Sequence, residues 1–326
     1  MTDRRSFLKT AAALTAGAAV SPSILASDKF LGAPSVAPAA KKEIGLQTYS
    51  LGMDLLKDLP GGLSRLAKAG YTQLELFGYN EKEQGFTAGG RNGAITVSAK
   101  DYKKAAADAG IKITGSHINP TVRDYTKENF AKFDEFWKKA ADLHAELGVT
   151  SMVQPSLPRI QNEDDAKMVS EIFNRAGDIA SKAGLLWGYH NHSGEFQRVP
   201  KAGEQPQPQG QGFRRPSGEF IEKLLIENTD PSKVFFELDV YWTVMGQQDP
   251  VAWINNYANR IKLLHIKDVW IINDSGMMNF PNIFAAGYKA GILGFYVEVE
   301  DGPVGGDQFQ AVITSGEFLK KASFVK

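Results

Sequence analysis

Arg260-Ile261-Lys262-Leu263-Leu264-His265-Ile266-Lys267-Asp268 is a short, apolar stretch of strand length that ends in polar residues. Its isoleucines and leucines predict a buried β-strand. A buried strand that ends in His, Lys and Asp is typical of an α/β barrel, which presents its chemistry at the C-terminal ends of its strands. The prediction therefore depends on whether other strands bring matching groups to the same rim.

Seven more stretches have this form, and helical segments separate them. The predicted strands are 43–50, 72–77, 111–117, 149–154, 185–192, 234–239, 261–265 and 294–298. The clearest helix is 127–148, where apolar residues recur at three- and four-residue steps. The glycine-rich stretch 78–94 and the Gln/Pro/Gly-rich stretch 201–216 are predicted to be loops. This alternation predicts a (β/α)8 TIM barrel. An open doubly wound sheet fits less well, because no glycine fingerprint follows the first strand.

The N-terminus has the layout of an export signal. Arg4-Arg5-Ser6-Phe7-Leu8-Lys9 precedes a weakly apolar run and a small-residue end, which resembles a twin-arginine signal. The alternative is an uncleaved membrane anchor, but the apolar run is short and rich in Gly and Ala. We therefore expect a signal peptide at 1–27, a linker at 28–41 and the barrel at 42–326. We also expect export, for example to the periplasm, without stable membrane insertion after cleavage.

Composition narrows the classes of ligand. The chain has 37 Lys plus Arg and 37 Asp plus Glu, so its charge favours neither nucleic acid nor an anionic membrane as a partner. A small polar molecule is the better expectation. The chain has no Cys, which excludes disulfides, thiolate metal sites and cysteine nucleophiles. Any metal ion must then be held by His and carboxylates.

Polar residues collect at the ends of the predicted strands. In chain order they are Gln47, Glu75, His117, Gln154, His190, His192, Asp239, His265, Glu298 and Glu300. Four of the five His residues belong to this set. The fifth, His144, lies within a helical stretch and is predicted to be at the surface or half-buried. His and carboxylates without Cys fit a divalent ion such as Mn, Co, Mg or Zn. Each residue taken alone could equally be a hydrogen-bonded core group.

Two interpretations of this set stay open. Because His190 and His192 are two residues apart on a predicted strand, both are expected on one face, and the sequence does not decide which coordinates. Asp239, His265 and Glu298 are the other expected ligands. Gln47, Glu75, His117, Gln154, Trp242 and Lys267 are expected to contact substrate or to support the ligands. Lys267 and Asp268 could instead form an ion pair at the rim.

The motifs resemble those of the sugar phosphate isomerase/epimerase superfamily, the xylose isomerase-like TIM barrels. They are Tyr189-His190-Asn191-His192, Glu237-Leu238-Asp239-Val240-Tyr241-Trp242, His265-Ile266-Lys267-Asp268 and Tyr296-Val297-Glu298. The resemblance implies a metal set of Glu, Asp, His and Glu from four strand ends, and Asp239, His265 and Glu298 match the last three. The first Glu is absent: strand five offers His190 and His192, with Glu195 just beyond.

The resemblance implies chemistry next to a carbonyl group. A divalent ion would polarise the carbonyl, with Glu298 as ligand and base and a His of strand five as the opposing acid. Isomerisation or epimerisation of a sugar or keto-sugar is the leading hypothesis. A keto-sugar lyase or dehydratase is the second, and a non-catalytic sugar-binding barrel is the third. An endonuclease IV-like role is the least consistent with the charge balance and export. A homo-oligomer is a further possibility.

Overall fold

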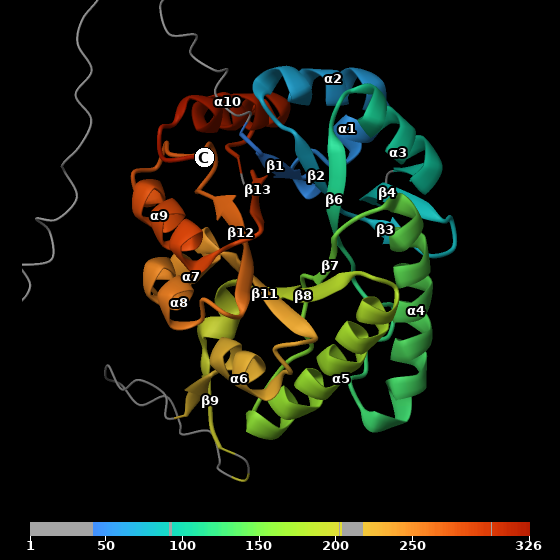
Figure 1. The fold of residues 1–326 in the computed structure, drawn as a ribbon, viewed down its shortest axis with the longest axis vertical. Coiled ribbons are helices and arrows are strands. Elements are labelled where there is room, and N and C mark those ends of the chain that lie inside the picture. Colours follow the sequence, from blue (N-terminus) through green and yellow to red (C-terminus); the bar gives the residue numbers. More distant parts are fainter. Residues whose placement is uncertain (1–41, 91–92, 202, 204–217, 301) are drawn as a thin grey trace, which may run out of the picture. The chain divides into compact units, whose positions relative to one another are not determined.

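A closed barrel of parallel strands forms the centre of the molecule. The computed structural model describes residues 42–90, 93–201, 203, 218–300 and 302–326. Within them the barrel consists of β1 (Gly45–Gln47), β2 (Gln73–Leu76), β6 (Lys112–His117), β7 (Ser151–Gln154), β8 (Leu186–His190), β11 (Val234–Asp239), β12 (Ile261–Lys267) and β13 (Gly294–Glu298). Each strand pairs with its neighbour, and β1 closes the ring by pairing with both β2 and β13. Helices surround the ring (Figure 1). The predicted TIM barrel is confirmed.

The surrounding helices follow the strands in order. They are α1 (Met53–Lys57), α2 (Leu59–Ala69), α3 (Ala99–Asp108), α4 (Phe130–Leu147), α5 (Glu163–Lys182), α6 (Ile221–Asn228), α7 (Val240–Met245), α8 (Pro250–Asn256), α9 (Phe280–Ala290) and α10 (Gln308–Lys321). Side-chain caps start several of them. Ser98 Oγ accepts from the backbone N–H of Asp101 at 3.1 Å, and Asn162 caps α5 through Oδ1. Asp58 caps α2 in the same way, because its Oδ1 accepts from the backbone N–H of Gly61 at 3.1 Å.

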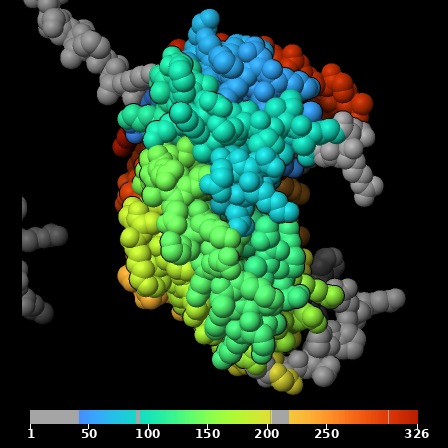
Figure 2. Space-filling model, turned by 90° about the vertical axis from the view of Figure 1, so that its right-hand side faces the viewer, coloured from blue at the N-terminus to red at the C-terminus, as the bar shows by residue number. Residues whose placement is uncertain are grey.

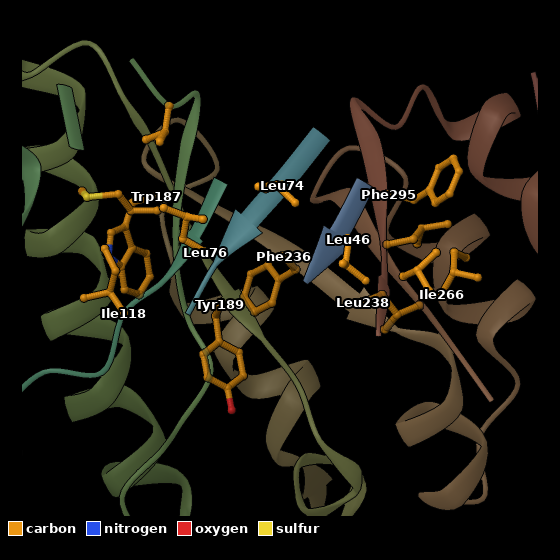
Figure 3. Close-up of a cluster of buried hydrophobic side chains, with 14 of the residues drawn as sticks. Leu46, Leu74, Leu76, Ile118, Trp187, Tyr189, Phe236, Leu238, Ile266 and Phe295 are labelled. Atoms are coloured by element: carbon orange, nitrogen blue, oxygen red, sulfur yellow. The ribbon is translucent and has the colours of Figure 1, made fainter. Parts of the chain in front are cut away.

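Alternation along the strands creates two separate apolar layers. Leu46, Leu74, Trp187, Phe236 and Ile266 point away from the barrel axis and pack beneath the helices (Figure 3). A smaller cluster of Val153, Phe235, Leu263 and Tyr296 is separate from that layer. Since residues two apart share a face, Phe235 places Glu237 and Asp239 on the inner side of β11. The barrel lumen therefore changes from apolar to polar toward the strand ends.

Two glycines make room for the large side chains of this inner cluster. A Cβ on Gly45 would lie 2.4 Å from Tyr296 Cδ1, and a Cβ on Gly188 would lie 2.5 Å from Phe235 Cζ. Both distances are far below van der Waals contact, so neither position accepts a side chain without displacing an aromatic ring. The small residues thus let the lumen fill beneath the polar layer.

One predicted loop is a small antiparallel sheet instead. The stretch 78–94 contains β3 (Tyr79–Asn80) and β4 (Gly85–Gly90), and β4 pairs with β5 (Gly93–Ser98). The loop prediction was wrong because glycine content hid the apolar side chains: Phe86 is fully buried. Figure 2 views this side of the molecule, where the cyan and teal residues of the sheet lie beside the green residues of α4.

His144 of α4 is buried under this sheet, which corrects the prediction of a surface or half-buried residue. Its ring lies 5.2 Å from that of Tyr79 and 5.9 Å from that of Phe86. Nδ1 hydrogen-bonds the backbone oxygen of Ala140 at 2.7 Å. Burial lowers the pKa of His144 to about 4, so the ring is neutral in the folded protein at neutral pH.

We expect His144→Phe to reduce the acid sensitivity of folding. The unfolded chain takes up a proton at this ring below about pH 6.5, whereas the folded protein does not do so until about pH 4. The wild type therefore loses stability as pH falls from about 6.5 to 4. Its free energy of unfolding decreases by at most ~1.4 kcal/mol per pH unit. Urea unfolding at pH 7 and pH 4.5 should show the variant gaining ~2 kcal/mol relative to wild type at the lower pH. A difference that is the same at both pH values would contradict this account.

Arg260 joins the start of β12 to neighbouring elements. Its guanidinium is buried and donates to the backbone oxygen of Ile226, to Thr229 Oγ1 at 2.6 Å and to the backbone oxygen of Val234 at 3.3 Å. It also lies 5.3 Å from the centre of the Phe236 ring. The N–H groups of the planar guanidinium thus donate at the same time to acceptors in α6, in the turn that follows α6 and in β11.

Arg260→Met should therefore destabilise the fold by ~3 kcal/mol, because buried carbonyl groups lose their donors. Urea unfolding measures this change. The matched control is Arg65→Met, since Arg65 is exposed and only stacks on Phe309 at 3.8 Å. Its expected cost is below ~1 kcal/mol. Equal costs at the two positions would refute the role of the buried donors.

The predicted signal peptide (1–27), the linker (28–41) and most of the predicted loop 201–216 lie outside the described residues. Among the residues that are described, no helix has the length and apolar character needed to cross a membrane.

Candidate functional site

Four strand ends converge on one group of potential ligand atoms. His190, Asp239, His265 and Glu298 come from β8, β11, β12 and β13, and one ligand atom of each lies within 4.8 Å of the others. His265 Nδ1 lies 3.4 Å from Glu298 Oε2 and 3.9 Å from Asp239 Oδ2. His190 Nε2 lies 4.0 Å from Asp239 Oδ2. Asp239, His265 and Glu298 are three of the ligands expected from the sequence, and His190 is one of the two histidines between which the sequence left the choice open. We call these four residues the upper cluster.

Asp239 divides its two carboxylate oxygens between two tasks. Oδ1 accepts from the backbone N–H of Trp242 at 2.8 Å and so caps α7. The Asp239 backbone N–H itself donates to Asn191 Oδ1 at 3.1 Å. These bonds hold the carboxylate so that Oδ2 turns toward the histidines.

The upper cluster has the features of an ion site. Asp239 Oδ2 and His265 Nδ1 are buried and have no hydrogen-bond partner among the described residues. Although His265 Nδ1 is within 3.4 Å of Glu298 Oε2, the geometry is not that of a hydrogen bond. Leaving such atoms buried and unsatisfied costs about 1–3 kcal/mol each. A divalent cation at this position would satisfy both atoms.

A second layer of charged groups lies against the first, and we call it the lower cluster. It consists of Glu75, His117 and Glu237, which are buried at the ends of β2, β6 and β11. His117 Nε2 lies 2.8 Å from Glu237 Oε2 and 3.2 Å from Glu75 Oε2. The rings of His117 and His265 stack with centroids 5.0 Å apart and an interplanar angle of 7°. Together the two clusters thus bring four carboxylates and three imidazoles close to one another.

Burial and mutual charge shift the protonation of these groups. Burial raises the pKa of Glu237 and of Asp239 to about 7 each; Glu298 adds to the rise and His265 opposes it. For Glu298, burial is outweighed by the positive charge of His265, whose Nδ1 lies 3.4 Å from Oε2, and the pKa is lowered to about 2. Burial lowers the pKa of His117 to about 4. Burial and mutual repulsion make it unfavourable for these carboxylates to be ionised at the same time. A bound cation would remove this cost, so the raised pKa values indicate a cation-binding site.

The other residues expected at the site occupy different positions. Gln47 is buried, and its Nε2 donates to Glu75 Oε2 at 2.8 Å. Gln154 faces away from the lumen because Val153 faces inward, and its Nε2 donates to Tyr125 Oη at 2.8 Å. His192 lies beyond the end of β8 and outside both clusters, with its ring 5.1 Å from that of His190. The substrate roles of these residues stay predictions.

Trp242 and Lys267 lie together beside the upper cluster. The Trp242 ring is 5.7 Å from the His192 ring, and Lys267 Nζ is 5.4 Å from the Trp242 ring. Lys267 is fully buried, and its ion pair is with Glu300 at 2.5 Å rather than with Asp268. Asp268 instead accepts from the backbone N–H groups of Val269 and Asn273, at 2.8 and 3.0 Å, and shapes the loop after β12.

Glu237 is the site residue that sequence reasoning missed. It stands two residues before Asp239 on a strand, and this spacing places both on the inner face. The alternation of side chains along the strand could therefore have identified Glu237 as a site residue. It was missed because its direct neighbours, Phe236 and Leu238, are apolar. Glu195, which could have replaced the absent family Glu, is buried elsewhere and accepts from Tyr189 Oη.

Two sizeable hollows lie away from these groups. One, of about 760 Å³, is at the opposite mouth of the barrel, where strand beginnings such as Lys112 and Gly294 line it. Another, of about 970 Å³, is a groove between α4 and α5. We place the site at the two clusters, because there the buried titratable groups converge and their pKa values are displaced.

Comparisons with known proteins agree with this geometry. The model of the xylose isomerase-like TIM barrel family matches residues 63–321, and that of the TAT pathway signal sequence matches residues 1–21. The chain thus carries an N-terminal signal for export, as predicted. An inosose dehydratase from Geobacillus thermodenitrificans is 24% identical over 68% of this chain and 80% of its own. A second, from Clostridium beijerinckii, matches over only 55% of its length.

Solved structures extend the comparison. A sugar phosphate isomerase/epimerase from Parabacteroides distasonis is 63% identical, with a TM-score of 0.85 over 89% of this chain and all of that chain. A 3-keto-D-glucoside 4-epimerase from E. coli shares the fold, with 16% identity and a TM-score of 0.59 over 86% of this chain and all of that one. The residues that match the family model include most of the barrel and all residues of the upper and lower clusters. The protein belongs to the xylose isomerase-like TIM barrel family.

Proposed function

We propose that this protein is a metal-dependent sugar isomerase or epimerase that removes a proton from the carbon next to a carbonyl group. The observation that carries the proposal is the upper cluster, in which four strands bring His190, Asp239, His265 and Glu298 within 4.8 Å of one another. The relatives support a small sugar or keto-sugar as substrate, since they include enzymes named as epimerases and dehydratases of such molecules.

The upper cluster would hold the ion. Its two imidazole nitrogens and two carboxylates favour Mn²⁺, Co²⁺ or Zn²⁺ over Mg²⁺, which prefers oxygen ligands. When bound, such an ion supplies Lewis acidity that makes the proton beside a carbonyl group easier to remove.

Glu298 is the proposed base. It is 6% exposed, whereas Asp239, Glu75 and Glu237 are completely buried, so it is the carboxylate of the two clusters that reaches solvent. Its lowered pKa keeps it ionised at neutral pH and able to accept a proton. His192 is half-buried beside Trp242 and is the proposed acid on the other side of the substrate. Its position outside both clusters leaves it available for proton transfer.

Elimination is the second candidate reaction. The two groups proposed for proton transfer differ in kind, since Glu298 is a carboxylate and His192 is an imidazole, and this asymmetry suits loss of a leaving group after proton removal. Such a reaction would make the protein a keto-sugar lyase or dehydratase. A relative of this chain is named as an inosose dehydratase.

Metal analysis combined with a product screen tests the proposal. The mature protein would be freed of metal with a chelator, reloaded with Mn²⁺, Co²⁺ or Zn²⁺, and incubated with keto-sugars and 3-keto-glycosides. We expect metal-dependent conversion; a product of unchanged mass indicates isomerisation or epimerisation, and loss of water or an aglycone indicates elimination. The proposal fails if the protein binds no divalent ion and no added ion produces turnover.

A further inference from the structure

Two imidazoles connect the upper and lower clusters through opposite ring nitrogens. His190 turns Nε2 toward Asp239 and Nδ1 toward Glu237 Oε2, which is 3.2 Å away. His265 turns Nδ1 toward Glu298 and Nε2 toward Glu75 Oε2, which is 2.8 Å away. Each ring therefore presents one nitrogen to each cluster.

This sharing decides between one ion and two. Taken alone, His117, His190, Glu237 and His265 also form a group that could hold an ion. However, a neutral imidazole has one nitrogen with a free lone pair, and its other nitrogen carries hydrogen. Two ions at once would require both His190 and His265 to lose both ring hydrogens. The distances of 3.2 Å from His190 Nδ1 to Glu237 Oε2 and of 2.8 Å from His265 Nε2 to Glu75 Oε2 are instead those of N–H···O hydrogen bonds.

We infer that Glu237, together with Glu75, is a positioning residue that holds His190 and His265 in the tautomers able to bind a single ion in the upper cluster. The inference rests on the proposed function and deepens it. With hydrogen on His190 Nδ1 and His265 Nε2, the lone pairs of His190 Nε2 and His265 Nδ1 face Asp239 Oδ2. A carboxylate on the outer nitrogen also makes the coordinating nitrogen a better donor.

The lower cluster is itself braced for this task. Gln47 Nε2 donates to Glu75 Oε2 at 2.8 Å, and the Gln47 amide oxygen accepts from the backbone N–H of Tyr49 at 3.0 Å. His117 Nε2 is 2.8 Å from Glu237 Oε2. Both carboxylates are completely buried, so no solvent competes for these bonds.

Charge couples Glu237 to residue 190. The pair of neutral His190 and anionic Glu237 has the same net charge as a pair of anionic Glu and neutral Gln. His190→Glu alone would place a second anion against Glu237 in a fully buried volume, which is unfavourable. Adding Glu237→Gln removes that repulsion. The two positions should therefore behave as a unit in metal binding.

Calorimetric titration of the metal-free mature protein with Mn²⁺ tests the inference without measuring activity. We expect one ion per wild-type chain and 10–100-fold weaker binding by Glu237→Gln. Glu222→Gln is the matched control, because Glu222 is an equally buried glutamate on α6 outside both clusters, and its Mn²⁺ affinity should equal that of wild type. His190→Glu should bind weakly, and His190→Glu/Glu237→Gln should recover at least tenfold over that single variant.

Distinct results overturn distinct statements. Two ions per wild-type chain, an affinity of Glu237→Gln within threefold of wild type, or no recovery in the double variant would each overturn the inference while leaving a metal site intact. A wild type that binds no divalent ion would overturn the proposed function and this inference with it. If Glu237→Gln does not fold, as judged by circular dichroism, Glu75→Gln is titrated under the same expectation.

Discussion

Glu298→Gln is expected to lower turnover by ~10³-fold. The amide keeps the size of the side chain but cannot accept the proton from the carbon beside the carbonyl. It also removes one anionic ligand of the proposed ion. Glu298 is the carboxylate of the two clusters that solvent reaches, and its lowered pKa keeps it ionised at neutral pH.

Two measurements check this result on the substrate that the product screen identifies. One is the steady-state rate, and the other is incorporation of solvent deuterium beside the carbonyl, which reports proton removal even when product forms slowly. The matched control is Glu43→Gln, the same change at an exposed residue by the opposite mouth of the barrel, and it should retain wild-type rates. A Glu298→Gln variant that exchanges deuterium within tenfold of wild type would show that another residue is the base.

Asp239→Asn should abolish the stabilisation of the folded protein by metal while leaving the metal-free fold intact. The two tasks of Asp239 separate in this variant: an Asn side-chain oxygen can still cap α7 at Trp242, but no anionic oxygen replaces Oδ2 toward the histidines. An ion present at a thousandfold excess over its Kd stabilises the wild type by ~4 kcal/mol. The variant should gain less than ~1 kcal/mol under the same conditions.

Thermal unfolding with and without about 1 mM Mn²⁺ measures the difference. For a site of micromolar affinity this concentration is about a thousandfold excess.

Burial raises the pKa of Asp239 to about 7, so the metal-free wild type carries a stability penalty that grows as pH rises from about 4 toward 7. Removal of this acid should make the metal-free variant at least as stable as wild type at pH 8. Asp239→Ala, which loses the cap as well, should be less stable than Asp239→Asn. Equal metal-induced shifts in wild type and Asp239→Asn would exclude Asp239 as a ligand.

Much of the fold follows from local pattern. Buried strands separated by amphipathic helices can bury both faces of a parallel sheet by closing into a barrel, and every expected strand of the barrel is present. The pattern failed at residues 78–94, where glycines suggested a loop but Phe86 and its neighbours make a sheet. It also failed at His144, because the sheet that buries this residue was not foreseen.

The barrel and the strand ends that carry His190, Asp239, His265 and Glu298 could be predicted from the sequence, because strand length, alternation and residue type are local properties. The folded structure was needed to show which nitrogen of His190 and His265 faces which carboxylate and that Glu237 lies next to them. It was also needed to show that His192 and Gln154 lie outside the two clusters. The physical reason is that strand register and the end of each strand set these directions, and both depend on packing against neighbours that are distant in the chain.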